Sequence, residues 1–124
     1  MLRGLILFAH GARESGWADP FEQLTARVRQ ALPDTDVRLA FLEIMRPDLA
    51  TAVAEMVAAG AGGIQIVPIF FGQGGHLQRD LPALIAALRT QFPDTAFRLA
   101  PAAGEDAGVV DAIAAFCVRQ SREG

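Results

Sequence analysis

Short apolar runs alternate four times along the chain with stretches of helical periodicity. The runs at residues 4–9, 36–42, 63–69 and 97–100 have the length of β-strands. The first run is continuously apolar, which is typical of a strand buried on both faces of a parallel sheet. The pattern therefore predicts an α/β fold, with four βα units forming a four-stranded parallel sheet that has helices on both faces. The shortest run, the last one, predicts an edge strand.

The segments between the runs predict four helices. Asp19 supplies a capping side chain before Pro20, and Glu22 follows three residues later, so a helix of about 13 residues is expected there. A second helix is expected from Pro47 to Gly60, and a third is expected to be capped by Asp80. Two apolar stripes mark the core faces of the first and last helices: Leu24, Val28 and Leu32, and then Val109, Val110, Ile113, Phe116 and Cys117. We expect Cys117 to be buried in its helix and residues 120–124 to fray.

One internal repeat stands out. Residues 32–40 and 92–100 share Pro-Asp-Thr and, after two intervening residues, Arg-Leu-Ala. The repeat indicates two βαβα halves, in which the first strand corresponds to the third and the second to the fourth. The alternative is a recurrent helix-to-strand turn that happens to use the same residues.

Composition narrows the class of protein. The chain has 124 residues, which predicts a single domain spanning residues 1–124. No apolar run approaches the roughly 18 residues that cross a bilayer, and no secretory signal pattern opens the chain, so we expect no membrane association and a cytoplasmic location. The net charge of −3 argues against a nucleic-acid partner. A single cysteine excludes an internal disulfide and a zinc site of paired cysteines.

The candidate chemistry lies where the predicted strands end. His10 follows the first strand, Glu43 follows the second, and the glycine-rich segment after the third leads to His76. Open α/β sheets bind ligands at the carboxyl ends of their strands. Two imidazoles and a carboxylate there predict a site for a divalent ion such as cobalt, nickel or iron with open coordination positions. The alternative is that each histidine is structural.

Three arginines accompany these residues. Arg13, Arg46 and Arg79 each lie three positions after a candidate ligand, and three guanidinium groups around one cleft would suit a substrate with several carboxylates. The alternative is that they are solvated surface charges. Five large apolar side chains are candidates for an apolar slot above the metal: Phe70, Phe71, Leu77, Met45 and Trp17. Phe70, Phe71 and Leu77 also fit partly buried positions in the core.

The glycine-rich loop at residues 72–75 does not match a phosphate-binding motif. It lacks the lysine and hydroxyl of a P-loop. Its glycines are better explained as a bend that brings His76 over the strand ends. We expect Gly74, Gly75 and Phe71 to contact the substrate.

Residues 7–13, 41–43 and, most specifically, 67–82 resemble the small CbiX-type sirohydrochlorin chelatases, with the SirB-type ferrochelatases closely related. The Gly-Gly-His-x-x-Arg-Asp-x-Pro segment within 67–82 is the strongest part of the likeness. The resemblance implies a chelatase-like fold, similar to half of a longer two-domain relative. It also implies a class II chelatase, which inserts a divalent metal into a tetrapyrrole without ATP during cobalamin or sirohaem synthesis.

The resemblance further implies roles for individual residues. The positions of His10 and His76 correspond to the catalytic histidines, and Glu43 joins them at the metal. We expect His76 or His10 to accept pyrrole protons. The metal, Co²⁺ or else Fe²⁺ or Ni²⁺, is then a substrate and no cofactor is permanently bound. Short members of this family are thought to act as homodimers, and a tetrapyrrole is wide enough to need both copies.

Two residues depart from the family pattern, and several alternative functions fit the same sequence. Ala12 stands where relatives often carry serine, and Gln78 stands where they often carry lysine. A sirohydrochlorin ferrochelatase and a non-catalytic metal-binding or delivery module fit the same residues. A histidine phosphatase would need an arginine where this chain has Ala9. A non-haem iron oxygenase also uses two histidines and a carboxylate, but the four βα units argue against it.

Overall fold

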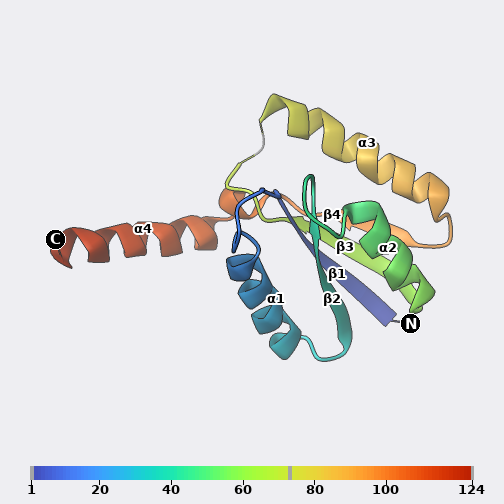
Figure 1. Ribbon diagram of the computed structural model, residues 1–124, viewed down its shortest axis with the longest axis horizontal. Coiled ribbons are helices and arrows are strands. Elements are labelled where there is room, and N and C mark those ends of the chain that lie inside the picture. The colour runs from blue at the N-terminus through green and yellow to red at the C-terminus, as the bar shows by residue number, and fades with distance from the viewer. Residues whose placement is uncertain (1, 73, 124) are drawn as a thin grey trace.

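The computed structural model describes residues 2–72 and 74–123, except the side chains of His76 and Gln78. Strands and helices alternate, as the sequence predicts (Figure 1). In chain order the elements are β1 (Leu2–Ala9), α1 (Asp19–Ala31), β2 (Thr35–Phe41), α2 (Leu49–Ala58), β3 (Ala61–Pro68), α3 (Gly75–Gln91), β4 (Ala96–Leu99), the 3-10 turn η1 (Ala103–Glu105) and α4 (Ala107–Glu123).

The four strands form one parallel sheet in the order β2-β1-β3-β4. The predicted α/β fold is therefore confirmed, and β4 is an edge strand as expected. β1 and β3 occupy the centre, which agrees with the apolar sequence of β1. All four carboxyl ends of the strands lie at one edge of the sheet, where the candidate residues follow them.

The main core lies on one face of the sheet. Ile6 and Phe8 of β1 and Ile66 of β3 point to this face and are at most 1% exposed. Helices α2 and α3 cover it, and Met56 and Leu81 are among the side chains that they bury there. Helix α1 lies on the opposite face beside β2 (Figure 1). Helices therefore occupy both faces, as predicted.

Two predicted helix starts are wrong. The N-cap of α1 is Ala18, which has no capping side chain, and Asp19 is already the first helical residue. Helix α3 begins at Gly75, so Asp80 lies inside it. Leu77 and Leu81, one helical turn apart, both pack on the main core, and this packing favours the earlier start over a local capping preference.

Several predicted core positions are exposed. Leu24 and Leu32, expected on the buried stripe of α1, are 38% and 41% exposed. Cys117 is exposed, contrary to the prediction, as is every other residue of α4. Helix α4 extends away from the sheet (Figure 1), so its apolar stripe lacks a partner among the described residues. The tail expected to fray is helical as far as Glu123.

The internal repeat has a structural counterpart. Nε of Arg29 donates to the carbonyl oxygen of Val37 at 2.9 Å, and sixty residues later Nη2 of Arg89 donates to the carbonyl oxygen of Phe97 at 3.1 Å. The turns before β2 and β4 also match, because Thr35 and Thr95 each donate a backbone hydrogen bond of 3.1 Å to the residue three positions earlier. The equivalent strands β2 and β4 form the two edges of the sheet.

Within the described residues, every helix is too short or too polar to cross a lipid bilayer.

Candidate metal and substrate site

His10 is the first residue after β1, and its position is held by two neighbours. Its ring lies against that of Phe70, with 4.4 Å between the ring centroids and an angle of 35° between the planes. The indole Nε1 of Trp17 donates to the backbone carbonyl oxygen of His10 at 2.9 Å. The His10 side chain nevertheless remains 46% exposed. The imidazole is thus oriented by packing on one side and open to a ligand on the other.

Glu43 follows β2 and meets His10 at the same edge of the sheet. Its Oε1 lies 3.3 Å from Nδ1 of His10, and its side chain is 43% exposed. A neutral imidazole that donates Nδ1–H to this carboxylate presents its Nε2 lone pair to a metal or a proton. A carboxylate in this position fixes the tautomer and the orientation of the ring. The structure therefore brings together two of the three side chains predicted to hold the metal.

A close approach of two loops produces this pairing. The backbone N–H of Leu42 donates to the carbonyl oxygen of Ala9 at 2.8 Å, which extends the pairing of β1 and β2 past their ends. The next residues cross directly over Gly11, where a Cβ atom would collide with the carbonyl oxygen of Glu43. Ile44 turns the chain with φ of 71°, a conformation that β-branched residues rarely adopt. Glycine at position 11 is therefore required for Glu43 to reach His10.

His76 lies in the first turn of α3, and its side chain is outside the described residues. Its predicted role as a ligand and catalytic base stays a prediction. Among the side chains that are described, no group of three His, Cys, Asp or Glu residues could hold a metal ion. Gly74 is the extended, exposed N-cap of α3, and Gly75 is its first residue. The glycine-rich segment thus leads into α3 at the end of the sheet that carries His10.

The three candidate arginines are all exposed, but they lie on different elements. Arg13 lies in the loop after β1, and Arg79 lies on α3. Arg46 lines a hollow of about 440 Å³ whose wall includes Glu22 of α1 and Arg38 of β2. Arg46 therefore stands towards the outer edge of β2, next to the N-terminus of α2.

Phe70 and Phe71 are neighbours in sequence with opposite environments. Phe70 is 4% exposed and belongs to the core, whereas Phe71 is 72% exposed. The interpretation that these side chains are partly buried in the core is confirmed for Phe70 and for the half-buried Leu77. It is wrong for Phe71. Gly104 explains the outward turn, because its backbone approaches so closely that a Cβ atom there would collide with the carbonyl oxygen of Phe71. Phe71 offers an apolar surface beside the strand ends.

The N-terminus of α2 carries the one carboxylate near this edge whose titration is clearly shifted in the described part of the chain. Hydrogen bonds from the side chain and the backbone N–H of Thr51 hold the pKa of Asp48 below its ordinary value, and the charge of Arg46 adds to the effect. The backbone N–H of Thr51 donates to Oδ1 of Asp48 at 2.8 Å. This carboxylate therefore serves as the N-cap of α2.

Sequence reasoning did not find the residues that support His10. The sequence predicts Phe70 as a slot or core residue and Trp17 as a slot residue. In the structure Phe70 packs on the His10 ring, and Trp17 donates a hydrogen bond to the His10 carbonyl oxygen. The sequence places Gly11 beside His10 but does not predict its close approach to Glu43. The one sequence signal for these residues is that they cluster around the predicted strand ends. This signal does not show which residues contact each other.

Comparison with known proteins shows which family the chain belongs to. The sequence profile of the CbiX family matches residues 4–118. This chain belongs to the CbiX family. Curated CbiX-like relatives include proteins named sirohydrochlorin cobaltochelatase from Saccharolobus islandicus, 32% identical over 85 residues, and from Sulfolobus acidocaldarius, 32% identical over 79 residues. The match to the S. islandicus protein covers 66% of this chain and 62% of that protein. The match to the S. acidocaldarius protein covers 64% of this chain and 63% of that protein.

Solved structures share the fold. A CbiX protein from Marinobacter aquaeolei VT8 superposes with a TM-score of 0.87 at 28% identity, covering 98% of this chain and 99% of that one. The sirohydrochlorin chelatase SirB from Bacillus subtilis subspecies spizizenii, solved in complex with cobalt, gives a TM-score of 0.67 at 24% identity. The superposition covers 82% of this CbiX chain and 44% of SirB, so the fold corresponds to less than half of the longer protein.

Proposed function

We propose that this chain inserts a divalent metal ion, Co²⁺ first among the candidates, into sirohydrochlorin or a related tetrapyrrole without ATP, as a step of cobalamin or sirohaem biosynthesis. One observation carries the proposal: the half-exposed His10–Glu43 pair, 3.3 Å apart at the carboxyl ends of two parallel strands. Membership of the CbiX family and the names of its curated relatives support it.

The reaction requires the chain to loosen water from the ion and to accept protons. As the metal binds the ring nitrogens, two pyrrole N–H protons leave the tetrapyrrole. Glu43 aligns His10 through Nδ1, and Nε2 of His10 is free to bind the incoming ion or to take a proton. Imidazole suits both tasks because it is a good ligand for these metals and titrates close to neutral pH. His76 is proposed as the second histidine at the metal.

The remaining proposed roles concern the substrate. Phe71 is proposed to lie against the macrocycle, and Gly74 and Gly75 to let the ring approach the backbone. Arg13, Arg46 and Arg79 are proposed to bind its carboxylates. A tetrapyrrole is too wide for the single open wall that one copy offers, so we propose a homodimer in which a second copy closes the cleft, acting in the cytoplasm.

The test is an anaerobic absorption spectrum of sirohydrochlorin mixed with Co²⁺, with and without the protein. We expect insertion faster than the spontaneous reaction, and a loss of about 100-fold or more of this acceleration in His10→Ala and His76→Ala. Glu43→Gln is expected to lower the rate about 10- to 100-fold, since it keeps the size but weakens the orientation of His10. Asp94→Asn, at the opposite end of the sheet, is the matched control and should keep the full rate.

Each alternative gives a different result in the same assay. A faster reaction with Fe²⁺ than with Co²⁺ would identify a ferrochelatase. A metal-binding or delivery module would bind Co²⁺, as seen by calorimetry, without changing the insertion rate. Full activity in both histidine variants would overturn the assigned site while leaving the fold and family untouched.

A further inference from the structure

The loop after β2 carries an isoleucine in a backbone conformation that isoleucine rarely adopts. The φ angle of Ile44 is 71°, and the N–H of Met45 donates to the carbonyl oxygen of Glu43 at 2.7 Å. This hydrogen bond between residues two apart closes a γ-turn of the rare kind that has positive φ at its centre. Positive φ strains a β-branched residue most, whereas glycine and asparagine adopt it at lower cost. The backbone of this turn therefore disfavours isoleucine.

The surroundings of the side chain do not compensate for this strain. Ile44 is 59% exposed, so its apolar side chain lies mostly in water and not in the core. Asparagine at this position would cost less both in the backbone and in solvation. Backbone strain of this kind concentrates at functional sites. Stability of the fold therefore does not account for Ile44, whereas a ligand that covers the exposed side chain would.

The place of the turn in the molecule is fixed at its base and at its tip. The N–H of Phe41 donates to the carbonyl oxygen of Pro47 at 2.9 Å and closes the base of the loop. At the tip, the residues on either side of Ile44 lie against Gly11, where a Cβ atom would collide with or crowd their backbone atoms. The loop is thus held directly beside His10, the neighbour of Gly11.

A second exposed apolar side chain lies on the other side of His10. Phe71 follows β3 and is 72% exposed. Strand β1, which leads into His10, lies between β2 and β3 in the sheet. Strands spaced about 4.8 Å apart place the ends of β2 and β3 roughly 10 Å from each other. Ile44 and Phe71 therefore flank the His10–Glu43 pair from opposite sides, where one flat ring lying over His10 would contact both.

We propose that Ile44 contacts the macrocycle of the tetrapyrrole and, together with Phe71, holds it over the His10–Glu43 pair. This inference rests on the proposed function and adds a substrate-contacting residue to it. The apolar side chain binds the face of the ring system, which leaves the carboxylates at its edge to the arginines. The strain of the turn is retained because it places an apolar side chain beside Glu43, where a relaxed turn would carry a polar one.

The first test measures the binding of metal-free sirohydrochlorin by the fluorescence of Trp17. This is the single tryptophan of the chain, and its indole donates to the carbonyl oxygen of His10, so a tetrapyrrole bound there quenches its emission. Ile44→Asn tolerates positive φ and removes the apolar side chain. We expect it to weaken binding about tenfold, as loss of a buried aliphatic contact should. Ile44→Leu keeps an apolar side chain and should restore most of the affinity.

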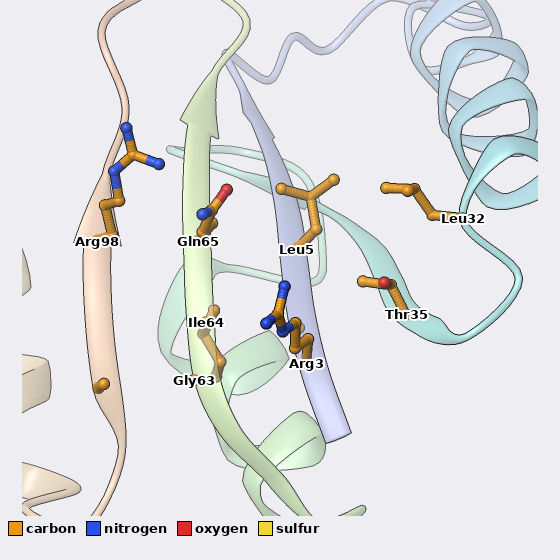
Figure 2. A pocket seen from close by; sticks show the side chains of 10 residues that line it. Arg3, Leu5, Leu32, Thr35, Gly63, Ile64, Gln65 and Arg98 are labelled. Carbon is orange, nitrogen blue, oxygen red and sulfur yellow. The ribbon is translucent and has the colours of Figure 1, made fainter. Parts of the chain in front are cut away.

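Thermal unfolding separates this contact from a packing role. Ile44→Asn should melt about 2–5 °C above the wild type, because it relieves strain in the folded chain. A packing role predicts a lower melting temperature. Leu32→Ala is the matched control and should bind sirohydrochlorin as the wild type does. Leu32 is 41% exposed and lines a separate hollow of about 490 Å³ with Leu5 and Gln65, on the sheet face opposite the main core (Figure 2).

Calorimetry with Co²⁺ shows whether Ile44 acts through its neighbour Glu43. We expect Ile44→Asn to bind Co²⁺ as tightly as the wild type, whereas Glu43→Gln should weaken Co²⁺ binding. An equal loss of Co²⁺ and sirohydrochlorin affinity in Ile44→Asn would show that the turn positions Glu43, and this would overturn the proposed contact with the macrocycle.

Three further results would overturn the proposal: unchanged sirohydrochlorin binding in Ile44→Asn, a lower melting temperature of that variant, or an Ile44→Leu protein that binds as weakly as Ile44→Asn. A wild type that does not bind sirohydrochlorin would overturn it as well. Failure of the proposed function gives a different result. A wild type that binds sirohydrochlorin through Ile44 without accelerating Co²⁺ insertion would refute the function alone. Accelerated insertion together with normal binding by Ile44→Asn would refute the role of Ile44 alone.

Discussion

At the scale of single residues, the adjacent residues Phe70 and Phe71 have different roles: the first is structural, and the second is proposed to be functional. Phe70 packs against both Phe8, with 6.0 Å between ring centroids, and His10. Phe71 projects into solvent and is 72% exposed. The two side chains are identical, so comparing their variants isolates the effect of environment.

Replacing each phenylalanine by alanine should give opposite profiles. We expect Phe70→Ala to lower the free energy of unfolding by about 3–5 kcal/mol, because it leaves a cavity in the core. Phe71→Ala should change stability by less than about 0.5 kcal/mol and should slow metal insertion. Urea unfolding and the sirohydrochlorin spectrum measure the two effects. A stable, fully active Phe71→Ala protein would remove Phe71 from the proposed substrate surface.

Gly11 provides a second comparison. In Gly11→Ala the new methyl group collides with the carbonyl oxygen of Glu43 and pushes the loop after β2 away from His10. We expect a loss of about 1–3 kcal/mol in stability and weaker Co²⁺ binding by calorimetry. Gly72→Ala is the control, since its Cβ would meet no atom within 4 Å. Equal effects of the two substitutions would show that loop flexibility, and not this contact, matters.

At the scale of elements, helix ends decide what the loops of the site can do. The capping carboxylate of Asp48 fixes the start of α2 immediately after the loop that holds Glu43 and Arg46. Helix α1, by contrast, begins without a capping side chain. The start of α2 is therefore better anchored than the start of α1.

Asp48→Ala should destabilise the protein by about 0.5–2 kcal/mol, as expected for loss of a cap. The hydrogen bonds from Thr51 lower the pKa of Asp48 in the folded state. Its contribution is therefore complete above the unfolded-state pKa of about 3.9 and is lost as the pH falls through the lower folded-state value. The stability difference between wild type and Asp48→Ala, measured by denaturant titration, should thus be constant near neutrality and shrink in acid. A difference that grows in acid would contradict this assignment.

At the scale of the whole molecule, the repeat divides the sheet into two equivalent halves. The contacts of Arg29 and Arg89 lie at the β2 and β4 edges and are separated by the two central strands. Strands spaced about 4.8 Å apart place these edges roughly 14 Å from each other. Contacts at this separation should contribute independently.

We expect Arg29→Ala and Arg89→Ala each to reduce the free energy of unfolding by about 1 kcal/mol, because each removes one charge-assisted hydrogen bond to a strand. The double variant should lose the sum within about 0.5 kcal/mol. Arg27→Ala, an exposed position on α1, serves as the control and should be near neutral. Unequal losses of stability in the two single variants would show that the repeat preserves the sequence of the turn but not the contribution of its arginine to stability.

Much of the fold was readable from the sequence because it depends on local periodicity. The apolar runs predicted all four strands and the edge position of β4, and the motif at residues 67–82 indicated the CbiX family. His10 and Glu43 were placed at one edge because parallel strands end together. Helix starts were less predictable: Asp80 looked like a cap, but the packing of Leu77 and Leu81 extended α3 to Gly75.

Tertiary structure alone decided which of these residues touch. A sequence specifies hydrophobic stripes but not the surface that each will cover, so the stripe of α4 was assigned to the core although α4 leaves the sheet. The support of His10 by Phe70 and Trp17, and the passage of Glu43 over Gly11, join segments distant along the chain. Such contacts arise only when the sheet brings its strand ends together, since local residue preferences carry no information about distant neighbours.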